Sequence, residues 1–159
     1  MAETTPQDHF ETESTQALLI VVGASLRAEA ADRPLAYALQ QRIRRWIDQH
    51  ADQMNIQLDP LVCCDLHYLS HRRMMSRPTI SLGGPGVNKL SAWFANRLQA
   101  AYFHENEMLI QLDPEFIDLR VCLWGMDHDC TRRVLDVFIE QYLDRYLRAV
   151  VSQTLPLER

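Results

Sequence analysis

Four short polar segments of the chain contain residue types that can bind a ligand or take part in acid–base chemistry. They are residues 23–27 (Gly-Ala-Ser-Leu-Arg), 65–67 (Asp-Leu-His), 83–88 (Gly-Gly-Pro-Gly-Val-Asn) and 124–131 (Trp-Gly-Met-Asp-His-Asp-Cys-Thr). Each comes at the end of an apolar run that is typical of a buried strand. Because the carboxyl ends of parallel strands lie at one edge of a sheet, we expect the four segments to converge there.

The glycine-rich segment favours the binding of an anionic group. Glycines let backbone N–H groups approach a ligand closely, and the helix start predicted at Asn88 attracts negative charge. We therefore expect a nucleotide or a phosphorylated metabolite. The residues predicted to bind it are Gly23, Ser25, Arg27, Gly83, Gly84, Gly86, Asn88, Trp124 and Thr131. The segment matches neither a phosphate-binding loop nor the G-x-G-x-x-G pattern, so an ordinary tight turn is the alternative interpretation.

Aspartates and histidines in two of the segments indicate a second kind of site. Carboxylates and imidazoles together can act as general acids and bases or bind a divalent metal. A hydrolase or transferase would use Asp65, His67, Asp127, His128 and Asp129. The alternative for residues 127–129 is structural, because aspartates cap helices and are stabilised at the positive helix end. The sequence identifies no cofactor, and its spacings match no known set of metal ligands.

Cysteines and a basic cluster give weaker signals. Cys63 and Cys64 are adjacent and would point to opposite faces of a strand, while Cys122 and Cys130 stand apart. Reduced, unreactive thiols are the simplest interpretation. The cluster at residues 71–77 contains three arginines and a histidine. It could hold a phosphate or carboxylate, although a solvated surface is the usual explanation of such charge.

Hydrophobic patterning predicts the elements that must position these segments. Apolar runs indicate strands at residues 17–22, 61–66, 79–82, 108–112 and 119–124. The last two can form a hairpin, with residues 108–112 at a sheet edge. Helices are expected from Pro34, within residues 68–76, from Asn88, and from Thr131 to about Val150. This alternation predicts an α/β fold, a Rossmann-like or flavodoxin-like three-layer sandwich with a mostly parallel sheet of about five strands and a long C-terminal helix.

Length and composition restrict the possible classes of protein. The 159 residues fit one α/β domain at residues 17–151, with a mobile acidic tail at residues 1–16 and a C-terminal tail at residues 152–159. A net charge of −5 argues against binding to nucleic acid or to an anionic membrane. The N-terminal residues lack the pattern of a signal peptide, and no apolar run can span a bilayer. We expect a soluble, cytoplasmic protein.

The predicted C-terminal helix has an unusually wide apolar face. Such a face must be buried, and self-association is one way to bury it. The helix at residues 131–150 therefore predicts a homo-oligomer or a protein partner. A structural or assembly subunit without a small-molecule site is the third functional alternative.

Two motifs are similar to those of a known group of proteins. A strand followed by Gly-Gly-Pro-Gly-Val-Asn at residues 83–88, and a later strand followed by Gly-x-Asp-x-x-x-Thr at residues 125–131, resemble bacterial cell-wall-binding repeats and archaeal surface-layer domains. Those proteins are secreted, whereas this chain shows no export signal. The resemblance therefore implies no function for this chain.

Overall fold

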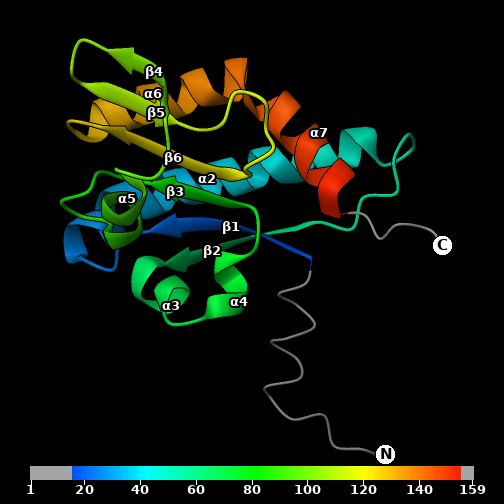
Figure 1. The fold of residues 1–159 in the computed structure, drawn as a ribbon, viewed down its shortest axis with the longest axis horizontal. Coiled ribbons are helices and arrows are strands. Elements are labelled where there is room, and N and C mark those ends of the chain that lie inside the picture. The colour runs from blue at the N-terminus through cyan, green and yellow to red at the C-terminus, as the bar shows by residue number, and fades with distance from the viewer. Residues whose placement is uncertain (1–15, 155–159) are drawn as a thin grey trace, which may run out of the picture.

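The computed structural model describes residues 16–154, which form a six-stranded mixed sheet with flanking helices (Figure 1). The strands are β1 (Ala17–Val22), β2 (Asp59–Cys64), β3 (Thr79–Leu82), β4 (Ala100–His104), β5 (Met108–Gln111) and β6 (Arg120–Gly125). Their order is β2-β1-β3-β6-β5-β4. Strands β2, β1, β3 and β6 are parallel neighbours, whereas β5 pairs antiparallel with β6, and β4 with β5.

The α/β class is confirmed, but the predicted sheet of about five mostly parallel strands is wrong. The strand order differs from both the Rossmann and the flavodoxin orders, so a sandwich of either type is also wrong. The predicted elements lack β4, which forms a tight hairpin with β5. Its turn contains Glu105 and Asn106 at φ values of 52° and 56°. The hairpin of β5 and β6 is confirmed, but β5 is not an edge strand, because β4 lies outside it.

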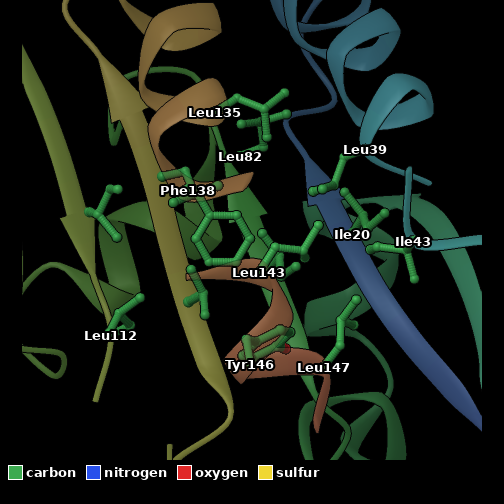
Figure 2. Packing of buried hydrophobic residues seen from close by; sticks show 14 of the residues in the cluster. Ile20, Leu39, Ile43, Leu82, Leu112, Leu135, Phe138, Leu143, Tyr146 and Leu147 are labelled. Carbon is green, nitrogen blue, oxygen red and sulfur yellow. The ribbon is translucent and has the colours of Figure 1, made fainter. Parts of the chain in front are cut away.

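Helices cover both faces of the sheet. On one face lie α2 (Leu26–His50), α6 (His128–Gln141) and α7 (Leu143–Thr154). On the other lie the short helices α3 (Asp65–Leu69), α4 (Arg72–Met75) and α5 (Lys89–Phe94). Alternate residues of β1 belong to the two apolar clusters, which explains why its sequence is continuously apolar. Figure 2 shows Leu39 and Ile43 of α2 beside Ile20 of β1.

Helix α2 begins earlier than predicted, and Pro34 lies inside it rather than in its first turn. The Ser25 side chain caps the helix by accepting a hydrogen bond from Ala28 N at 3.2 Å. Pro34 is exposed, so the carbonyl that it leaves without a donor can be hydrated. The longer helix carries Arg27 and Asp32, which would otherwise lie in a loop.

The predicted long C-terminal helix matches only in part, because two helices, α6 and α7, occupy this part of the chain. Tyr142 lies between them with a non-helical φ of −126°. The bend lets α6 and α7 each pack on the sheet, and Phe138, Tyr146 and Leu147 are all fully buried (Figure 2). The wide apolar face is thus covered within the chain, which removes the physical reason for predicting self-association there. Whether the chain forms an oligomer stays a prediction.

The ends of the chain are only partly described. Residues 1–15 of the predicted acidic tail and residues 155–159 of the predicted C-terminal tail lie outside the described range. Helix α7 continues to Thr154. Of the helices described, none is both long enough and apolar enough to cross a bilayer.

Candidate functional site

A cavity of about 310 Å³ lies at the carboxyl edge of the parallel strands. It is bounded by the first turns of α2, the loop after β3 and the loop from β6 to α6, so three of the four polar segments meet there. The predicted site residues that line it are Arg27, Gly84, Gly86, Trp124, Asp127, His128 and Thr131. Convergence of these loops follows from the parallel pairing of β1, β3 and β6.

The glycine loop presents two unused backbone donors beside this cavity. Gly83 N donates to Leu123 O at 2.9 Å, and the amides of residues 87 and 88 donate to Gly84 O. By contrast, the amides of Gly84 and Gly86 have no acceptor within residues 16–154. Both residues line the cavity, so a ligand bound there would lie beside these two amides.

Arg27 adds a positive charge at the same place. It lies in the first turn of α2 and is exposed, and it has no ion pair or hydrogen bond with any described residue. An arginine near a helix N-terminus gains nothing from the helix dipole, which already carries positive charge there. The guanidinium group therefore remains free to bind an anion.

Two of the predicted residues shape the β6–α6 loop. The Asp127 carboxylate caps α6 by accepting a hydrogen bond from Cys130 N at 2.8 Å, which lowers the pKa of Asp127. The structural interpretation of this aspartate is thus confirmed. Thr131 Oγ1 accepts from Gly125 N and donates to Asp127 O, so this hydroxyl is occupied within the loop.

Asp65 is buried and binds backbone groups of the protein itself. Its side chain is 2% exposed and accepts from Ala24 N at 3.1 Å, Leu66 N at 2.8 Å and Lys89 N at 2.7 Å. The predicted strand at residues 61–66 ends at Cys64, because Asp65 begins α3. This carboxylate fixes the positions of two loops, and it does not line the cavity.

Asn88 has a similar structural role. It is 1% exposed, and its Oδ1 accepts from the amides of Leu90 and Ser91, which caps α5 as predicted. Its Nδ2 donates to Val21 O, Ser81 Oγ and Leu82 O. With every donor and acceptor engaged, the side chain has no group left for the ligand that the sequence assigns to it.

The remaining predicted residues lie outside the cavity. Gly23 allows a close approach of two loops, since a Cβ there would be 1.8 Å from Val87 O. Ser25 caps α2. His67 is exposed on α3, with its ring 4.4 Å from that of His71, and Asp129 forms an exposed ion pair with Arg132 at 3.5 Å. Of the five predicted catalytic residues, the cavity brings together only Asp127 and His128.

Asp32 is the site residue that the sequence interpretation missed. It is 6% exposed, lines the cavity and has no hydrogen-bond or ion-pair partner in the described part of the chain. Burial raises the pKa of Asp32, and the charges of His128 and Arg27 oppose this effect only in part. One signal was available. The buried residues Ala28, Asp32 and Ala36 recur every four positions, which places a carboxylate on an apolar stripe.

Gly83 makes room for this carboxylate. Its φ is +106°, and a Cβ there would lie 2.6 Å from Asp32 Oδ2. A side chain at this position would be strained and would also displace the carboxylate. Gly83 is thus a structural requirement of the site and does not itself line the cavity.

Thiols and metal ligands offer no second centre within the described residues. All four cysteines are free, and desolvation raises the pKa of Cys63 to about 12 and that of Cys122 to about 11. No group of three or more His, Cys, Asp or Glu residues among those described could hold a metal ion. Arg77 of the basic cluster binds the sheet instead, donating from Nε to Ala17 O at 2.9 Å.

No protein-family model matches the chain, and no curated protein or solved structure is detectably similar to it. The functional conclusion therefore depends on the residues of the cavity.

Proposed function

We propose that this chain binds a small anionic molecule, such as a nucleotide or a phosphorylated metabolite, in the cavity at the carboxyl edge of its sheet. The observation that carries the proposal is a set of three unused donors on one cavity, namely the Arg27 guanidinium and the amides of Gly84 and Gly86. Backbone amides combined with an arginine are a common way for proteins to bind phosphate or carboxylate oxygens.

The size and walls of the cavity support a small ligand. Its volume of about 310 Å³ is at the lower end of the range usual for small-molecule sites. Trp124 lines it beside Gly84 and supplies an aromatic wall. Met126 is 68% exposed and also lines the cavity, so an apolar part of a ligand could cover it.

Titration with ethyl phosphate, followed by amide NMR of the whole chain, tests this proposal. We expect saturable shifts of the Gly84 and Gly86 amide signals. Arg27→Gln should weaken binding roughly ten-fold, because a charge-assisted hydrogen bond is lost. Arg44→Gln is the matched control, since Arg44 is exposed on the same helix but does not line the cavity.

Two results would count against anion binding at this site. One is the absence of any saturable shift at the glycine loop. The other is an equal loss of affinity in Arg27→Gln and Arg44→Gln, which would indicate a general effect of net charge instead of a localised site.

An enzymatic role is the second candidate, and the position of Asp32 favours it. A carboxyl with a raised pKa and the imidazole of His128 lie on one cavity, and these are groups that general acid–base catalysis uses. Such a hydrolase or transferase would release p-nitrophenol from p-nitrophenyl phosphate. Asp32→Asn should reduce that rate about a hundred-fold. Release no faster than in buffer alone would argue against this candidate.

A further inference from the structure

The Asp32 carboxylate is a buried acceptor that the protein leaves without a donor. Its side chain is more than nine-tenths buried, lines the cavity and makes no hydrogen bond with any residue in the range 16–154. Buried polar groups normally have partners, because an unpaired one loses its hydration without compensation. The Asp32 oxygens are not among the described side-chain atoms that are sealed from solvent without a partner, so they open onto the cavity, where a ligand could donate to them.

The surrounding fold holds this carboxylate in place instead of letting it turn to solvent. Asp32 lies inside α2, between the buried residues Ala28 and Ala36. A Cβ at Gly83 would lie 2.6 Å from Asp32 Oδ2, so only a glycine at this position leaves room for the carboxylate. Backbone geometry at two distant positions in the sequence thus maintains an arrangement that costs stability, which is typical of functional sites.

Neither Arg27 nor His128 satisfies this carboxylate. Arg27 and His128 are close enough to act on it electrostatically, yet neither forms an ion pair or hydrogen bond with it. The other carboxylate of the cavity, that of Asp127, already accepts a hydrogen bond from Cys130 N. Asp32 is therefore the acceptor that remains for a ligand.

We propose that the ligand is zwitterionic, with its anionic group bound by Arg27 and the glycine-loop amides and an ammonium group bound by Asp32. This inference rests on the proposed function and adds the second half of the ligand. An ammonium group supplies several N–H donors and a charge opposite to that of the carboxylate, so it compensates burial better than a neutral donor. Aminoalkyl phosphates and amino acids are small metabolite classes that carry both groups.

Three probes separate the two halves of the ligand. O-phosphoethanolamine carries both groups, ethyl phosphate only the anion, and ethylammonium only the cation. With the wild-type chain, NMR titration should give an affinity for O-phosphoethanolamine roughly ten-fold or more above that for ethyl phosphate. In Asp32→Asn the two phosphates should bind equally, and in Asp136→Asn, an exposed control, the difference should persist.

Each outcome decides between the two proposals. If ethyl phosphate binds the wild-type chain as tightly as O-phosphoethanolamine, the ammonium subsite is wrong while the anion site stands. If neither phosphate shifts the glycine-loop amides, the proposed function fails and the zwitterion fails with it. Because the wild-type comparison alone decides the first point, the inference stays testable even if Asp32→Asn does not fold.

Discussion

Replacing Asp65 by alanine is expected to destabilise the whole fold. The sequence places this residue among the catalytic candidates, whereas its contacts are those of a structural residue. Its carboxylate accepts hydrogen bonds from Ala24 N, in the loop after β1, and from Lys89 N, at the start of α5 where the loop after β3 ends. Loss of both bonds would release the two loops that bound the cavity and would leave their amides buried without acceptors.

The magnitude follows from the number of bonds. A hydrogen bond to a charged group contributes about 1.5–3 kcal/mol, so Asp65→Ala should lose roughly 3–6 kcal/mol. This is a large part of the roughly 5–15 kcal/mol that stabilises an ordinary domain. Asp65→Asn keeps one oxygen as an acceptor and should lose about half as much, because one of the two amides then faces an NH₂ group.

Urea unfolding followed by far-UV circular dichroism measures these differences. Asp136→Asn is the control, since Asp136 is exposed on α6, and its stability should stay within about 0.5 kcal/mol of the wild type. An Asp65→Ala variant less than about 1 kcal/mol below the wild type would refute the structural role. It would also return Asp65 to the catalytic candidates.

Three further results are expected. Asn88→Ala should lose roughly 2–4 kcal/mol in the same unfolding assay, because a helix cap and several buried hydrogen bonds disappear; a loss no larger than that of an exposed asparagine would contradict this. Desolvation raises the pKa of the Cys63 thiol to about 12, so at pH 8 iodoacetamide should modify it on the order of a thousand times more slowly than an ordinary thiol. Mass spectrometry measures this rate, and unfolding in urea should restore full reactivity. Burial raises the pKa of the Asp32 carboxyl above its ordinary 3.8, so the folded chain keeps this proton at a higher pH than the unfolded chain does. The free energy of unfolding therefore falls as the pH rises from 3.8 through the pKa of the folded state. Asp32→Asn should therefore be more stable than the wild type at pH 7, with the difference shrinking toward pH 3.8; a constant difference would be inconsistent with the shift.

The strands inside the sheet were predictable from the sequence, whereas the edge strand β4 was not. The bounds of β1 and β3 are as predicted, because both strands lie inside the sheet and are apolar throughout. Strand β4 lies at the sheet edge, and its sequence, Ala-Ala-Tyr-Phe-His, lacks the Val, Ile and Leu residues of the buried strands. At α2, the prediction started the helix at Pro34, although a proline on the solvent side of a helix is tolerated and the helix begins after Ser25.

The location of the site was predictable, but the role of each polar residue was not. Loops that follow parallel strands gather at one edge, whichever strands are neighbours. Whether a polar side chain faces a ligand or a backbone group depends on contacts between distant segments. Asn88 and Asp65 bind the protein itself, while Asp32, which is not among the predicted site residues, lies on the cavity.

The position of β6 has a consequence for how the chain folds. This late strand lies between β3 and β5 in the sheet, and the parallel ladders pair Ala17 with Asp59, Leu19 with Thr79, and Thr79 with Arg120. Strand pairings between residues this far apart in the sequence form slowly, because the chain loses the entropy of closing a large loop before the paired strands stabilise it. A nascent chain that ends before β6 would expose two open strand edges, so molecular chaperones should be needed most at that stage of synthesis.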